Sequence, residues 1–130
     1  MFKKKLKRMP KEVEMDIYGI DNMELSKKKC IPCEGGIPPL NEEECNVLRK
    51  EIDDNWEVIS LHHLEREWSF DDFINALNFT NKLGGICEEE NHHADFELGW
   101  GRVKVKIFTH KIDGLAEADF ILAAKFDCLD

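Results

Sequence analysis

The stretch that decides the fold reads FELGWGRVKVKIFTH and covers residues 96–110. In its second half Val103, Val105 and Ile107 alternate with the lysines at 104 and 106. This alternation has the period of a β-strand with one buried face. Gly101 separates this run from the apolar run before it, as expected for two strands joined by a turn. The stretch therefore predicts a hairpin whose second strand contributes one face to the core.

A second pair of extended runs lies upstream, at residues 56–61 and 65–70. Trp56 and Val58 alternate with more polar positions in the first run, and Trp68 lies in the second. These runs also predict a hairpin. Because strands of adjacent hairpins favour antiparallel pairing, the four strands are expected to form one antiparallel sheet.

Two helices are expected before and between the hairpins. Asn41 precedes three glutamates, a capping side chain followed by acids that complement the helix dipole, and this helix is expected to end near Asp53. Ser69 and Asp72 resemble a capping box that opens the main core helix. That helix is expected to continue past the glycine pair at residues 84–85 toward residue 89, although each glycine costs roughly 1 kcal/mol relative to alanine.

A closing helix is expected after Gly114, where Leu115, Leu122 and Phe126 recur with two small alanines. The order of elements is then αββαββα. This order predicts an α+β fold, a four-stranded antiparallel sheet with three helices packed on one face. The uncovered sheet face and edges need water, charge or a second subunit, so a homo-oligomer is expected.

Composition narrows the class of protein. The chain has 130 residues and a formal net charge of -9, with a dense basic cluster at residues 3–8. Binding to nucleic-acid phosphates needs a surface rich in Lys and Arg, and the folded domain is acidic. No nucleic-acid partner is therefore expected. The sequence has no apolar run of membrane-spanning length and no secretory signal, so no membrane association and a cytoplasmic location are expected. An odd count of five cysteines favours free thiols.

The chain is expected to divide into a poorly ordered N-terminal tail, residues 1–29, and one domain, residues 30–130. The tail mixes Lys, Glu, Gly and Pro without a sustained period. Cys30 and Cys33 have a spacing known from redox and zinc sites, but neither a second cysteine pair nor a βαβ context accompanies them. They are expected to be two thiols in a connector.

Histidines carry the functional signal, because His92, His93 and His110 lie within one short segment near the C-terminus. Imidazole can give and take a proton near neutral pH, so this cluster can supply an acid and a base together. Ordinary polar histidines are the alternative reading. A metal site is not expected, because adjacent histidines in an extended segment point to opposite faces. The second pair, His62 and His63, is expected to be solvent-exposed at a hairpin turn.

Several motifs together resemble the pterin-4a-carbinolamine dehydratase family. They are the run REWSFDDF at residues 66–73, the pair His92-His93, the pair Thr109-His110, Gly114-Leu115 and Asp119. The resemblance extends from about residue 30 to residue 129. It implies the αββαββα fold, a homodimer or homotetramer, and dehydration of 4a-hydroxytetrahydrobiopterin to quinonoid dihydrobiopterin without a cofactor or metal.

The same resemblance assigns the site residues. It implies that His92, His93 and His110 are catalytic, and that four neighbours bind or orient the substrate: Glu88, Asn91, Thr109 and Asp119. We expect His92 and His110 to transfer protons and His93 to orient the pterin. The rings should meet around one flat, water-accessible slot, with an acid such as Glu88 or Asp119 holding an imidazole in one tautomer.

Three positions depart from the family pattern. Ala94 replaces a proline after the histidine pair, Asn91 replaces an aspartate, and Ala116 replaces a Ser or Thr that caps the last helix. The departures bear on the rate of turnover more than on the type of reaction. A noncatalytic dimerisation or assembly partner and a pterin-binding module without turnover remain the alternative functions.

Overall fold

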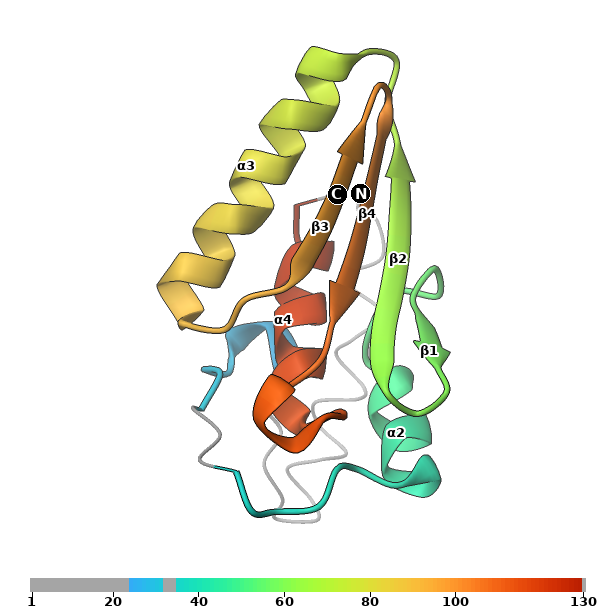
Figure 1. Cartoon of the computed structure of the whole chain (residues 1–130), viewed down its shortest axis with the longest axis vertical. Helices are drawn as coiled ribbons and strands as arrows, with labels where there is room; N and C mark the ends of the chain where they lie inside the picture. Colours follow the sequence, from blue (N-terminus) through green and yellow to red (C-terminus); the bar gives the residue numbers. More distant parts are fainter. Residues whose placement is uncertain (1–23, 32–34, 130) are drawn as a thin grey trace.

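The computed structural model describes residues 24–31 and 35–129, and in this part of the chain the four predicted strands form one antiparallel sheet (Figure 1). The strands are β1 (Glu57–Ile59), β2 (His63–Ser69), β3 (Asp95–Gly99) and β4 (Arg102–Ile107). Their order across the sheet is β1-β2-β4-β3. The two hairpins therefore meet through β2 and β4, so β4 lies in the interior of the sheet.

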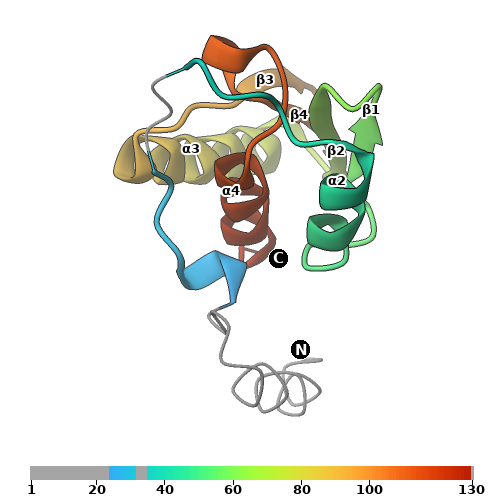
Figure 2. The same cartoon turned by 90° about the horizontal axis from the view of Figure 1, so that it is seen from below.

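Three helices lie side by side on one face of this sheet, as Figure 2 shows from below. They are α2 (Glu42–Arg49), α3 (Phe73–Glu90) and α4 (Glu117–Asp127), with single 3-10 turns at η2 (Leu25–Lys27) and η3 (His110–Ile112). The predicted α+β class and the αββαββα order are confirmed. No helix in the described ranges is both long enough and apolar enough to span a bilayer.

The predicted start of α2 is correct and its predicted end is wrong. Asn41 and Glu44 form a reciprocal capping box, each side chain accepting a hydrogen bond from the other residue's backbone N–H at 2.9 Å. The helix ends at Arg49 instead of near Asp53. From there the backbone closes short three-residue turns, in which Glu51 N–H donates to Leu48 and Ile52 N–H donates to Arg49.

The predicted cap of α3 is also wrong. Ser69 is the last residue of β2 and pairs with Arg102, so it cannot cap a helix. Asp72 caps α3 instead, its side chain accepting a hydrogen bond from Asn75 N–H at 2.9 Å. The predicted passage through the glycine pair is confirmed, because α3 is continuous to Glu90 and ends where Asn91 adopts a left-handed conformation with φ 54°.

The core lies between the sheet and α4. Val103, Val105 and Ile107 of β4 are fully buried, as the alternation predicts, while Lys106 between them is exposed. The helix α4 is buried on nearly every side: its buried residues are Ala118, Asp119, Phe120, Ile121, Leu122, Ala123, Ala124 and Phe126. A helix surrounded in this way holds the other elements together.

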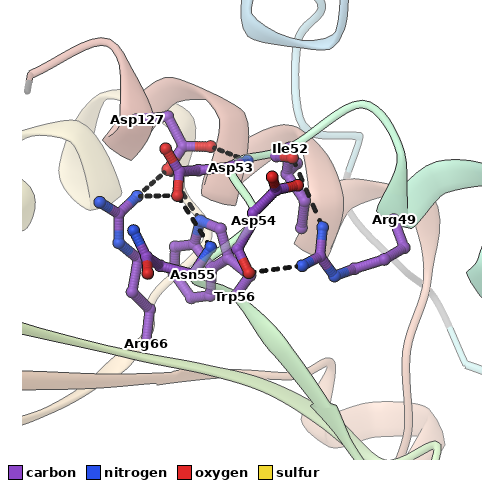
Figure 3. A network of polar contacts seen from close by, with 8 residues as sticks. All are labelled: Arg49, Ile52, Asp53, Asp54, Asn55, Trp56, Arg66 and Asp127. Carbon is purple, nitrogen blue, oxygen red and sulfur yellow. Dashed lines mark hydrogen bonds and ion pairs between the residues drawn. The ribbon is translucent and has the colours of Figure 1, made fainter.

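A polar network lies at the C-terminal end of α4 (Figure 3). Asp127 accepts hydrogen bonds from Arg66 of β2 at 2.6 Å, from Trp56 Nε1 at 2.7 Å and from the backbone N–H of Asp53 at 2.9 Å. Burial nevertheless raises the pKa of Asp127 to about 6, against the opposing effect of these donors. The network joins α4 to β2 and to the α2–β1 connection.

The described part of the predicted tail packs against the domain. Leu25 is buried, Lys125 of α4 donates a hydrogen bond to the Ser26 carbonyl at 2.7 Å, and Cys30 N–H donates to Glu90 at 3.0 Å. Residues 24–29 thus lie along α4, whereas residues 1–23 lie outside the described residues. The Cys30 thiol is buried, which raises its pKa to about 12. Cys33 also lies outside the described residues.

Candidate active site

The centre of the candidate site is the pair formed by His92 and Asp119. His92 follows the left-handed residue that ends α3, and its Nε2 lies 2.6 Å from Oδ1 of Asp119 in the first turn of α4. The other oxygen, Oδ2, accepts hydrogen bonds from the Thr109 hydroxyl and from Ala116 N–H, both at 2.8 Å. Asp119 has no solvent exposure, so these three donors replace water around its carboxylate.

This arrangement selects one tautomer of His92. A carboxylate only accepts hydrogen bonds, so Nε2 of His92 carries the proton that is donated to Asp119. Nδ1 of the neutral ring is then left with a lone pair. The buried carboxylate also orients the ring, because Thr109 and Ala116 hold its other oxygen, Oδ2, in place. His92 can therefore act as a base through Nδ1 and, once protonated there, as an acid.

Asp119 has a second, structural role. Ala116 is the N-cap of α4 and has no side chain that can accept a hydrogen bond, as the sequence indicates. The carboxylate of Asp119 reaches back to Ala116 N–H, which is the half of a capping box that does not need a capping side chain. One residue thus stabilises the start of α4 and orients His92.

His93 has its own carboxylate and lies closer to solvent. Its Nε2 is 2.5 Å from Oε2 of Glu88, and the two side chains are 55% and 78% exposed. The left-handed turn at Asn91 returns the chain toward the last turn of α3, which brings Glu88 within reach of His93. An exposed pair of this kind orients a ring weakly, so His93 is freer than His92 to adapt to a bound molecule.

His110 begins η3 directly after Thr109, the residue that bonds to Asp119. Its ring packs on Phe108 with centroids 4.1 Å apart, and the residue is exposed. In the part of the chain that the structure describes, no hydrogen bond or ring contact joins His110 to His92 or His93. The structure thus brings together His92, Thr109 and Asp119, and the common slot for all three rings remains a prediction.

The loop that carries His110 is closed by a backbone bridge. Thr109 N–H donates to the Gly114 carbonyl at 2.8 Å, and the two residues form an isolated antiparallel bridge. A Cβ at Gly114 would lie 2.6 Å from Cβ of Pro39, which explains why a glycine stands there. The connector that contains Pro39 therefore packs tightly beneath the loop.

The expected solvent exposure is wrong for His63 and holds only in part for His62. Their side chains are 32% and 13% exposed, and the rings contact each other and Phe108. The sequence of a hairpin turn does not show which strand packs beside it. The pairing of Leu64 with Ile107 places the residues before Leu64 beside those after Ile107, so the register carries the missing signal. No group of three described His, Cys, Asp or Glu side chains is arranged to hold a metal ion.

The fold and this geometry together define an α+β protein with carboxylate-bound histidines suited to proton transfer. A sequence profile described as pterin 4 alpha carbinolamine dehydratase matches residues 38–129. The chain belongs to this family. The match covers every strand, α2, α3 and α4, and all the candidate site residues.

Individual relatives agree with this assignment. A protein of Rubrobacter xylanophilus, named as a candidate pterin-4-alpha-carbinolamine dehydratase, is 51% identical over 106 residues, which are 82% of this chain and 98% of that protein. A protein of Alkaliphilus metalliredigens with the same name is 52% identical over 103 residues, 79% of this chain and 93% of its own. A crystal structure titled as a transcriptional coactivator/pterin dehydratase from Brucella melitensis superimposes with a TM-score of 0.65 at 27% identity, covering 70% of this chain and 97% of that one.

Proposed function

We propose that this protein dehydrates 4a-hydroxytetrahydrobiopterin to quinonoid dihydrobiopterin, in the recycling of tetrahydrobiopterin. The observation that carries the proposal is the His92–Asp119 pair, which holds an imidazole in the tautomer with a free Nδ1 inside a member of the dehydratase family. The reaction removes one molecule of water from the pterin. It therefore needs proton transfer and, as proposed, no cofactor or metal.

The proposed chemistry uses two protons. The hydroxyl on the carbinolamine carbon leaves as water after an acid protonates it, and a base removes the proton of a ring N–H, so that the C–O bond breaks as the C=N bond forms. We assign these transfers to His92 and His110, one as acid and the other as base. His92 is supported by its fixed tautomer, and His110 by its position directly after Thr109.

We assign binding and orientation of the pterin to His93, with Glu88 holding its ring. Asn91 contributes the left-handed turn that separates the histidine pair from α3. Ala94 leaves His93 without the restraint that a following proline would impose, which favours adaptation to the substrate over rigidity. Turnover is proposed to take place in a homodimer or homotetramer that also covers open parts of the sheet.

A coupled dehydration assay with synthetic 4a-hydroxytetrahydropterin tests the proposal. The full chain should accelerate the reaction above its spontaneous rate, and His92→Ala and His110→Ala should each lower kcat by roughly 100-fold, the usual contribution of one acid or base. His93→Ala should mainly raise KM. A surface variant on α3, Lys82→Ala, serves as the control and should match the wild type.

The same assay separates the alternatives. A wild-type protein that binds a pterin analogue without accelerating dehydration would be a binding module. One that neither binds nor turns over the pterin would be a partner in assembly or dimerisation. Unchanged rates in both His92→Ala and His110→Ala would reject the site assignment even if the wild type were active.

A further inference from the structure

Four aromatic rings form a row beside the candidate site, in the order His63, His62, Phe108 and His110. Successive ring centroids are 5.3, 4.5 and 4.1 Å apart. His63 begins β2 and His62 lies in the turn before it, while Phe108 and His110 follow β4. The β1–β2 turn is therefore connected by side chains to the residue that we assign to proton transfer.

His62 also holds the far end of the loop that carries His110. Its Nε2–H donates a hydrogen bond to Oδ1 of Asp113 at 2.7 Å, and its Nδ1 lies 3.1 Å from Nδ1 of His63. The Asp113 side chain is 86% exposed, so this bond alone orients the His62 ring weakly, and the contacts of the ring with His63 and Phe108 add to it. Asp113 is the left-handed residue that ends η3, with φ 50°.

The loop is consequently anchored on both sides of His110. On one side Thr109 bonds to the buried Asp119, and on the other Asp113 bonds to His62. His110 itself is exposed, and its ring rests on Phe108, which also packs against His62. An exposed ring has several staggered orientations available, so its neighbours must select the productive one.

The turn that delivers His62 is strained. Ser60 and Leu61 both have positive φ, 53° and 55°, and His62 N–H closes the turn on the Ile59 carbonyl at 2.8 Å. Two-residue turns with this geometry usually contain Asn and Gly, because a β-carbon is unfavourable there. Such strain persists where surrounding contacts determine the conformation, and the rings of His62 and His63 pack on Phe108 directly after this turn.

We propose that His62 is a positioning residue for His110, acting through the Phe108 ring and the Asp113 carboxylate. This inference rests on the proposed function, because it assumes that His110 transfers a proton in the dehydration. His62 does not touch the substrate. It sets the direction in which the His110 imidazole faces, and hence the rate of the proton transfer rather than the affinity for the pterin.

The test uses full-length protein labelled with ¹³C and ¹⁵N in its histidines. The ring resonance of His110 is assigned from its loss in His110→Gln. His62→Ala should move this resonance by more than its linewidth and lower kcat about tenfold, with KM within twofold of the wild type. Lys111→Ala, a change in the same loop that leaves His62 and Asp113 in place, is the control and should do neither.

Two further variants separate the contacts. His62→Gln keeps an N–H donor for Asp113 and loses the ring, so it should recover part of kcat relative to His62→Ala. Asp113→Gly removes the carboxylate and favours the positive φ, and it should reproduce the shift of the His110 resonance. It also provides the measurement if His62→Ala fails to fold.

An unmoved His110 resonance in these variants would overturn the proposal, and so would a moved resonance with unchanged kcat. If the wild type showed no dehydration at all, the proposed function would fail on that result. The resonance would still decide whether His62 holds the ring of His110. The two failures are therefore distinguishable.

Discussion

At the scale of single residues, Asp119 makes more hydrogen bonds within the candidate site than His92, His93 or His110. Its two oxygens accept hydrogen bonds from His92, Thr109 and the backbone of Ala116 in a position without solvent. A buried carboxylate leaves its donors unpaired when it is removed, and each unpaired donor costs free energy. The same residue therefore controls both the tautomer of His92 and the start of α4.

We predict that Asp119→Asn lowers kcat by roughly 100-fold or more, because an amide nitrogen facing Nε2 would force His92 into the opposite tautomer. Asp119→Ala should also lower the free energy of unfolding by about 3 kcal/mol. Kinetics and denaturant unfolding measure the two effects. Thr109→Val removes one donor and keeps the His92 contact, so it should have a much smaller effect on kcat. Wild-type kcat in Asp119→Asn would contradict the proposed role of this pair.

Cys30 gives a second prediction at this scale. Its thiol is buried, donates to the Ala118 carbonyl at 3.5 Å, and has a pKa raised to about 12, so it should be a poor nucleophile. In a Cys33→Ser background, a maleimide at pH 8 should modify the exposed Cys128 first and leave Cys30 unmodified, as read by mass spectrometry of peptides. Modification of Cys30 as fast as Cys128 would favour a redox role for the cysteine pair.

At the scale of elements, α3 contains its own weak point. Gly84 and Gly85 lie in the middle of the helix, and a Cβ at either would meet nothing within 4 Å. Glycine in a helix interior loses more conformational entropy than alanine on folding. We predict that Gly85→Ala raises the free energy of unfolding by roughly 0.5–1 kcal/mol, measured by urea unfolding. A decrease instead would indicate that another subunit contacts the helix at that position.

The elements also show which features the sequence could predict. Strand β4 was predictable because its side chains alternate between a buried and a solvated face, and α2 because Asn41 and Glu44 cap it through local hydrogen bonds. The cap of α3 was mispredicted, because Ser69 is held in β2 by its pairing with Arg102. Long-range pairing overrode a local capping signal there.

In the candidate site, His92 contacts Asp119 and His93 contacts Glu88. All four residues were predicted from the sequence to belong to the site. The contacts of His62 with Phe108 and Asp113 could not be predicted, since they depend on how β2 and β4 pair across a long sequence separation. A histidine pair at a hairpin turn has no local pattern that distinguishes a packed ring from a solvated one.

At the scale of the whole molecule, α4 connects the site to the rest of the domain. Asp119 lies in its first turn and Asp127 at its last residue, about 12 Å apart along a helix of 1.5 Å rise per residue. One carboxylate holds the candidate site, and the other holds β2 and the α2–β1 connection. Loss of either should disturb the same central helix from opposite ends.

The stability of the molecule should depend on pH through Asp127. Its pKa is raised from 3.8 to about 6, chiefly by burial. Between these values the folded state binds more protons than the unfolded state, so the free energy of unfolding should fall as the pH rises from about 4 to 6 and stay lower above that. The shift corresponds to a contribution of up to roughly 3 kcal/mol. Carboxyls with lowered pKa, such as Glu65 and Glu90, act in the opposite direction, so a variant must isolate the group.

Asp127→Asn provides that isolation, because it cannot titrate and its altered hydrogen bonds add only a pH-independent offset. The difference in unfolding free energy, variant minus wild type, should rise by up to roughly 3 kcal/mol between pH 4 and pH 7, measured by urea unfolding at several pH values. Asp54→Asn, an exposed acid in the neighbouring turn, should show a flat difference over the same range. A flat profile for Asp127→Asn as well would mean that Arg66 and the other donors fully offset the burial of this carboxylate in the folded protein.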